Sequence, residues 1–119
     1  MSAGVPADRG VVVHLSEDDP AKQANVMANI ANLLAELGQQ TPVELVVHGP
    51  GLSAALASAA HADVLAGLIG RGVGVAACAN TMRARSVGEV DLLAGVHIVP
   101  AGVAQLVRRQ REGWAYLRP

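Results

Sequence analysis

The chain has 119 residues, is 51% hydrophobic and 16% charged, and carries a formal net charge of −1. This composition excludes intrinsic disorder, which needs low hydrophobicity and high charge, and a single cysteine excludes a disulfide scaffold. Nucleic-acid binding generally needs a strong basic excess, so no nucleic-acid partner is expected. The length predicts one domain over residues 1–119.

The longest uncharged stretches do not predict a membrane protein. Residues 45–62 and 92–107 are interrupted by glycine, proline or histidine, so neither resembles a transmembrane helix. Residues 1–8 lack the basic and apolar regions of a signal peptide. We therefore expect a cytoplasmic protein with no membrane partner, in which the single thiol stays reduced.

The aromatic content is low, with no Phe, one Trp and one Tyr. Small side chains bury little area each, and a short domain buries a smaller share of its surface than a long one. Association between copies would compensate for this, so the composition favours a homo-oligomer.

In chain order, residues 10–16 form a continuous β-branched run that predicts a strand buried on both faces. Acidic residues and a proline at 17–20 predict the start of a helix that ends near Leu37, before Gly38. Residues 43–48 predict a second strand. The apolar stripe expected on the helix consists of Val26, Ile30, Leu33, Leu34 and Leu37.

The middle of the chain continues this alternation. The Gly-Pro-Gly sequence at 49–51 predicts a turn, and an alanine-rich helix is expected over residues 52–60. A further helix is expected over residues 61–69, followed by a third strand at 73–77.

The last third begins with a short helix capped by Asn80 or Thr81 and reaching residue 85. Residues 87–93 fit no single element. A strand is expected at 96–99, then a helix to about Arg111 and a terminal strand at 114–117. Strands that alternate with helices indicate βαβ units. The predicted fold class is therefore α/β, with three layers and a mostly parallel sheet of about five strands.

Ligands of such sheets bind beyond the carboxyl ends of the strands. The first strand ends near His14, the second at His48 and Gly49, and the third near Cys78. Two histidines and the only thiol are thus expected at one edge of the sheet. This is the main functional signal in the sequence.

Cys78 is the candidate catalytic residue. A thiolate is the reactive form of cysteine, and a helix N-terminus lowers the pKa of a thiol placed just ahead of it. Asn80 and Thr81 are the candidate residues that bind and stabilise an anionic sulfur there. The alternative is that Cys78 is a small buried core residue, as free cysteines often are.

His14 and His48 are candidate binding residues, with Gly49 leaving room for a ligand. Both histidines could instead be structural, with backbone hydrogen bonds. A zinc site formed by His14, His48 and Cys78 is conceivable. No pair of these residues has close ligand spacing, so we predict no metal and no cofactor.

Other polar residues are expected to have structural roles. His61 lies at a helix start and His97 inside a strand, and both are interpreted as structural. Arg108, Arg109 and Arg111 are interpreted as a solvated helix C-terminus, where cations are favourable.

Six short motifs occur in the order found in a known family. They are VVHLS at 12–16, NIANLL at 29–34, ELVVHGPG at 44–51, ACANTM at 77–82, VPAGV at 99–103 and EGWAY at 112–116. Together they resemble DsrE-like proteins over nearly the whole chain, including single-chain members and DsrE-, DsrF- and TusD-type sulfur-relay relatives.

The resemblance implies a flavodoxin-like fold of the DsrE/YchN type and assembly into trimers or hexamers. Some relatives carry sulfur as a persulfide on a cysteine in this region, which would be Cys78 here. It implies an intracellular sulfur-relay protein, sulfurtransferase-like, with sulfur donor and acceptor proteins as partners. The relay subunits work in hetero-complexes, whereas nothing in this sequence shows a partner chain. The alternative function is a non-catalytic oligomeric binding module with a small-molecule or anion pocket at the strand ends.

Overall fold

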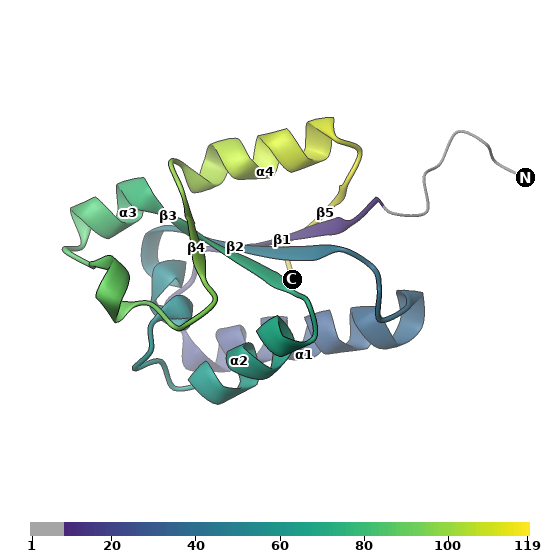
Figure 1. Cartoon of the computed structure of the whole chain (residues 1–119), viewed down its shortest axis with the longest axis horizontal. Helices are drawn as coiled ribbons and strands as arrows, with labels where there is room; N and C mark the ends of the chain where they lie inside the picture. The colour runs from purple at the N-terminus through teal and green to yellow at the C-terminus, as the bar shows by residue number, and fades with distance from the viewer. Residues whose placement is uncertain (1–8) are drawn as a thin grey trace, which may run out of the picture.

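The described chain forms one continuous sheet, in which the first strand pairs with the last. The structure is a computed structural model and describes residues 9–119, so the residues examined for a signal peptide lie outside it. All neighbouring strands are parallel, in the order β4-β3-β2-β1-β5 (Figure 1). The strands are β1 (Val11–Leu15), β2 (Val43–Val47), β3 (Gly74–Cys78), β4 (His97–Val99) and β5 (Ala115–Leu117). The predicted five-strand parallel sheet is confirmed.

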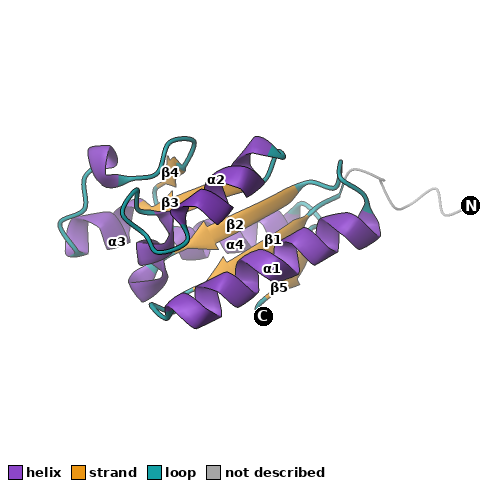
Figure 2. Cartoon of the chain, turned by 90° about the horizontal axis from the view of Figure 1, so that it is seen from below, coloured by secondary structure: helices purple, strands orange, loops and turns teal. Residues whose placement is uncertain are grey.

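The helices form the two outer layers. One face of the sheet is covered by α1 (Pro20–Leu37) and α2 (Ala62–Gly70), seen in front of the sheet in Figure 2. The other face is covered by α4 (Gly102–Arg111), above the sheet in Figure 1, while α3 (Ala79–Ala84) continues directly from β3. The three-layer α/β class is therefore confirmed. No helix within residues 9–119 is both long and apolar enough to cross a membrane.

The first helix begins and ends where its sequence predicts. The side chain of Asp19 accepts the Ala21 N–H at 3.1 Å, with Pro20 in the first turn, and Gly38 follows the helix with a φ of 112°. One part of the predicted apolar stripe is wrong. Leu37, in the last turn of α1, is 63% exposed, whereas Met27, which the predicted stripe omitted, is buried.

Two segments of the middle and late chain differ from expectation. Residues 52–60 are not an α-helix: a 3-10 helix, η1 (Gly49–Ala55), starts within the predicted turn. A Cβ at Gly51 would lie 2.3 Å from the Leu15 carbonyl oxygen, so only glycine allows this turn to pack so closely on β1. A second short 3-10 helix, η2 (Glu89–Asp91), lies in the segment that fitted no element.

The strands alternate between two unequal cores. Val13, Leu45 and Val75 contribute to the larger core beneath α1 and α2. Val12, Val46 and Ala76 contribute to a smaller core beneath α4. Because side chains alternate along a strand, the face beneath α4 also receives the side chains of His14, Glu44 and Cys78. The polar residues of the sheet thus belong to one layer of the molecule.

Candidate functional site

The strand register places His14, His48 and Cys78 on one face at one edge of the sheet. His14 pairs with Val46, and the last pair between β2 and β3 is Val47 with Ala77. Continuing that register by one residue sets His48 beside Cys78, on backbones about 5 Å apart. The structure therefore brings together the three residues that the sequence placed at strand ends.

The two histidines form a direct contact. The Nε2 atoms of His14 and His48 are 2.6 Å apart, the ring planes differ by 22°, and the ring centroids are 4.7 Å apart. The nitrogens are much closer than the centroids, so the rings meet edge to edge rather than face to face. This geometry is that of one N–H···N hydrogen bond, in which one ring donates and the other accepts.

Tyr116, on β5, extends this contact toward solvent. Its hydroxyl lies 2.7 Å from Nδ1 of His14, and the residue is 42% exposed. Sequence reasoning did not identify Tyr116 as a site residue. It reaches His14 because β5 pairs with β1, and no local pattern in the sequence determines which strand the last one joins.

The surroundings of the pair disfavour a positive charge on it. Burial is the largest cause lowering the pKa of His14, and His48 and Arg118 lower it further while Glu17 opposes them. Burial and then Arg118 also lower the pKa of His48. Arg118 is held nearby by Ser16 Oγ at 3.3 Å and by the Glu17 carboxylate at 3.4 Å. Both imidazoles are therefore neutral at neutral pH.

Cys78 sits at the junction of β3 and α3 and is 6% exposed. Burial alone would raise the pKa of its thiol. The Thr81 side chain and the N–H groups of Gly102, Thr81 and Asn80 outweigh burial, so the pKa of Cys78 lies below its usual value. These polar groups favour the thiolate.

The other predicted binding residues take part in different ways. Cys78 itself occupies the cap position of α3, and no side chain caps this helix, so the prediction that Asn80 or Thr81 is the cap is wrong. The Asn80 side chain is exposed and accepts a hydrogen bond from Arg83, so Asn80 offers the sulfur its N–H alone. The hydroxyl oxygen of Thr81 accepts the Gly49 N–H at 2.8 Å. Gly49, with a φ of 56°, thus supports Thr81 through its N–H.

Gly102, the first residue of α4, lies against both His48 and Cys78. A Cβ at this position would lie 3.0 Å from Cβ of His48 and 3.3 Å from Cβ of Cys78. Glycine thus lets the start of α4 approach closely enough for its N–H to reach the sulfur. Sequence reasoning did not identify this role of Gly102.

A zinc site formed by His14, His48 and Cys78 does not fit this geometry. The facing Nε2 atoms are at hydrogen-bond distance from each other, which leaves no room for an ion between them. Within residues 9–119, no group of three or more His, Cys, Asp or Glu side chains is arranged to hold a metal ion.

A second polar cluster lies beneath α4 and was missed in the sequence. The buried carboxylate of Glu44 accepts hydrogen bonds from Gln105 at 2.7 Å and Arg109 at 3.0 Å, and His97 lies 3.2 Å away. Arg109 also lies 4.3 Å from the centroid of the Trp114 ring, so its interpretation as a solvated residue is wrong. Burial would raise the pKa of Glu44, but the Arg109 and Gln105 hydrogen bonds keep it below the usual value. Through Gln105 and Arg109, this cluster holds α4 against Glu44 of β2.

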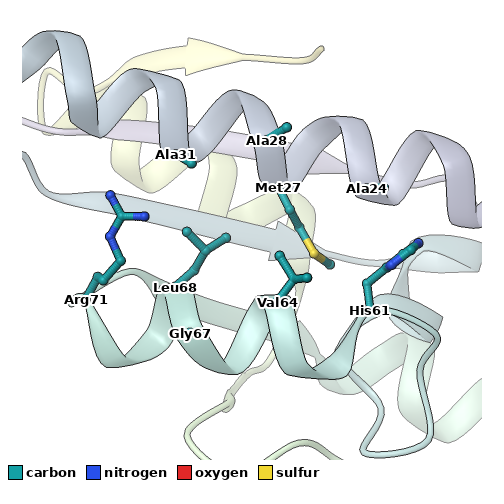
Figure 3. A pocket seen from close by; sticks show the side chains of 9 residues that line it. All are labelled: Ala24, Met27, Ala28, Ala31, His61, Val64, Gly67, Leu68 and Arg71. Carbon is teal, nitrogen blue, oxygen red and sulfur yellow. The ribbon is translucent and has the colours of Figure 1, made fainter.

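An apolar hollow lies on the opposite side of the sheet, between α1 and α2 (Figure 3). It has a volume of about 310 Å³, and Met27, Val64 and Leu68 point into it. None of the predicted site residues lines it. The thiol and the histidine pair thus belong to the α4 side alone.

A family model described as the DsrE/DsrF-like family matches residues 10–119. The chain belongs to the DsrE/DsrF-like family. The resemblance seen in the six sequence motifs is thereby confirmed. No curated protein matches the chain.

Solved structures place this DsrE/DsrF-like chain among proteins of the same fold. MTH1491 of Methanobacterium thermoautotrophicum, a protein of unknown function, is 39% identical with a TM-score of 0.90, covering 94% of this chain and 100% of that one. YchN of E. coli is 17% identical with a TM-score of 0.78, covering 93% and 99%. BT1422 of Bacteroides thetaiotaomicron is 13% identical with a TM-score of 0.76, covering 95% and 97%. The last two show the fold alone.

Proposed function

We propose that this DsrE/DsrF-like protein is an intracellular sulfur carrier that holds sulfane sulfur as a persulfide on Cys78. The observation that carries the proposal is the position of Cys78 at the start of α3 and beside Gly102 at the start of α4, where the Thr81 hydroxyl and nearby N–H groups lower the pKa of its thiol. Family membership supports it, since relatives of the sulfur-relay type use a cysteine in this region.

The donors around Cys78 suit both forms of the carrier. In the free form they favour the thiolate, which attacks the outer sulfur of a donor persulfide. In the loaded form the same N–H groups lie near an anionic persulfide, and preorganised donors in a dry site stabilise such an anion by several kcal/mol. Because Cys78 is nearly buried, small donors or a docked donor protein are the expected partners.

The test is the mass of the protein after exposure to glutathione persulfide. The wild type is expected to gain one sulfur atom that a thiol reductant removes. Cys78→Ser should gain none and keep the melting temperature of the wild type. Because the chain has one cysteine, every mass shift is assignable. A wild type that gains no sulfur, or a Cys78→Ser protein that still gains it, would overturn the proposal.

A second candidate is a non-catalytic binding module with an anion or small-molecule site at the strand ends. The near-complete burial of Cys78 favours it. This function predicts that Cys78→Ser keeps ligand affinity. Calorimetric titration of both proteins with sulfite and thiosulfate separates the two candidates, since the carrier needs the thiol and the module does not.

We also propose a homo-oligomer, either a trimer or a hexamer. Exposed apolar side chains support it, because they lie along the edge strands and the outer surface of α4. They are Ile98 on β4, Val103 and Val107 on α4, and Leu117 on β5. Sedimentation equilibrium is expected to give a mass three or six times that of the chain. A monomer at micromolar concentration would contradict this.

A further inference from the structure

The hydrogen-bonded chain Tyr116–His14–His48 has one end in solvent, and its other end is His48, the residue that the strand register sets beside Cys78. Its two links measure 2.7 Å and 2.6 Å, and Tyr116 is the exposed end. His48 is the inner end, since it shares the contact at Gly102 with Cys78. The role proposed for Cys78 makes no use of these three residues.

The chain has two proton arrangements that satisfy the same distances. In one, the Tyr116 hydroxyl donates to Nδ1 of His14, Nε2–H of His14 donates to Nε2 of His48, and Nδ1 of His48 carries a proton. In the other, every donor and acceptor is reversed, and Nδ1 of His48 is a free base. When the chain changes from the second arrangement to the first, Nδ1 of His48 takes up one proton and the Tyr116 hydroxyl releases one to solvent.

We propose that His48, His14 and Tyr116 are a proton relay for the sulfur exchanged at Cys78, taking the proton of an incoming acceptor thiol and returning one to a departing donor thiolate. The inference rests on the sulfur-carrier function proposed above, and it gives His48, His14 and Tyr116 a role in proton transfer. His48 is the proton-exchanging end, and His14 and Tyr116 are positioning residues that act through it.

The exchange balances without an oxidant or a reductant. In loading, the Cys78 thiolate attacks the outer sulfur of a persulfide R–S–S–H. A bond from Sγ to the outer sulfur forms and the donor S–S bond breaks, which gives Cys78–S–S–H. The thiolate R–S⁻ leaves with the electron pair and takes a proton from the relay, and the new persulfide ionises by losing its own proton to solvent. In unloading, an acceptor thiol gives its proton to the relay and attacks the outer sulfur. The bond to Sγ breaks, and its electron pair returns to the Cys78 thiolate.

The charges that face the pair suit this task. Arg118 lies on the solvent side with Glu17 as its partner, and Cys78 lies on the inner side. A neutral pair accepts a proton from a thiol, whereas a permanently charged pair could not. Arg118 and burial keep the pair in that neutral state.

The experiment compares two acceptor thiols on protein loaded with glutathione persulfide. 2-Mercaptoethanol is protonated at neutral pH and needs a base, whereas an aromatic thiol such as 4-mercaptobenzoate is already a thiolate. His48→Gln and His14→Gln should slow transfer to 2-mercaptoethanol by about 100-fold. Transfer to the aromatic thiolate should change less than threefold. Equal slowing with both acceptors, or slowing with neither, would overturn the relay.

Two further variants sharpen the result. Tyr116→Phe removes only the solvent end, so it should slow transfer to 2-mercaptoethanol and leave the aromatic acceptor unaffected. His61→Gln is the matched control, because His61 contacts the Pro20 carbonyl at 3.0 Å and no part of the relay. It should behave as the wild type with both acceptors.

A measurement independent of sulfur separates this inference from the function on which it rests. ¹⁵N NMR of the histidine rings should show a coupling between Nε2 of His14 and Nε2 of His48 across the shared proton. Absence of that coupling in the wild type would overturn the relay even if Cys78 carries sulfur. Absence of sulfur on Cys78 would overturn the carrier function and the task of the relay together, whatever the coupling shows.

Discussion

The hydroxyl oxygen of Thr81 accepts the N–H of Gly49 at 2.8 Å, and this bond leaves the hydroxyl hydrogen free to point at Cys78. Gly49, two residues after β2, thus orients a donor for the sulfur at the end of β3. One hydrogen bond joins the start of η1 to α3, two segments far apart in sequence, and the state of the thiol depends on both.

Thr81→Val should raise the pKa of Cys78, because it removes a hydrogen bond to the thiolate and leaves the Gly49 N–H without its acceptor. A hydrogen bond to a charged group contributes about 1.5–3 kcal/mol, so alkylation by iodoacetamide at neutral pH should slow about tenfold or more. The rate is read by intact mass against pH. Thr81→Ser keeps the hydroxyl and should label like the wild type. Equal rates for Thr81→Val and Thr81→Ser would show that the hydroxyl does not act on the sulfur.

Gly102→Ala should destabilise the fold and disturb the thiol. The new Cβ would lie 3.0 Å from Cβ of His48 and 3.3 Å from Cβ of Cys78, so α4 must move away from the sheet. Overpacking of this kind typically costs about 1–3 kcal/mol, and the shift withdraws one N–H from the sulfur. Urea unfolding checks the first effect and the pH dependence of alkylation checks the second.

Gly67→Ala is the control for that change. Gly67 lies in α2 with no other atom within 4 Å of an added Cβ, so alanine should stabilise the protein by about 0.5–1 kcal/mol. A Gly102→Ala protein as stable as Gly67→Ala would mean that the close approach of α4 has no energetic consequence.

The fold was predictable because its signals are local. The continuous apolar run ending at His14, the helical spacing of Val26 and Ile30, and the stop at Gly38 each act within a few residues. The gathering of His14, His48 and Cys78 at one edge followed from the same rules, since parallel strands end together.

The contacts that tune the site were not predictable, because they depend on strand order and on backbone donors. Tyr116 reaches His14 only because β5 joins β1, and Gly102 reaches Cys78 only because α4 starts above β3. Glu44 did carry a signal. A carboxylate inside an apolar buried strand needs a partner, although the sequence alone does not show that this partner is Arg109.

Glu44→Gln should lower the free energy of unfolding by about 2 kcal/mol at neutral pH, because Arg109 loses a buried charged acceptor. The pKa of Glu44 is depressed in the folded protein. Its contribution is therefore fully present above the ordinary pKa of a glutamate and is lost as the pH falls through the depressed value. The stability gap between wild type and variant should narrow on acidification, as measured by urea unfolding across pH.

Glu112→Gln is the matched control for the same arginine. Glu112 bonds Arg109 at 3.0 Å on the exposed side of the helix, where an ion pair contributes less than about 1 kcal/mol. A gap between Glu44→Gln and the wild type that stays constant with pH would contradict the assignment to the carboxylate charge.

Arg118→Ala should raise the pKa of both His14 and His48, because Arg118 lowers each of them from the exposed side of the site. NMR titration of the ring protons measures this directly, with Arg71→Ala as the control, since the side chain of Arg71 hydrogen-bonds Gln39 and lies on the opposite side of the sheet from the histidine pair. A histidine whose folded pKa is depressed binds its proton more readily in the unfolded chain, so the wild type should lose stability as the pH falls through about 6.5. That loss should be smaller in Arg118→Ala. Unchanged histidine titrations would mean that burial alone keeps the pair neutral and that Arg118 serves only to hold Ser16 and Glu17.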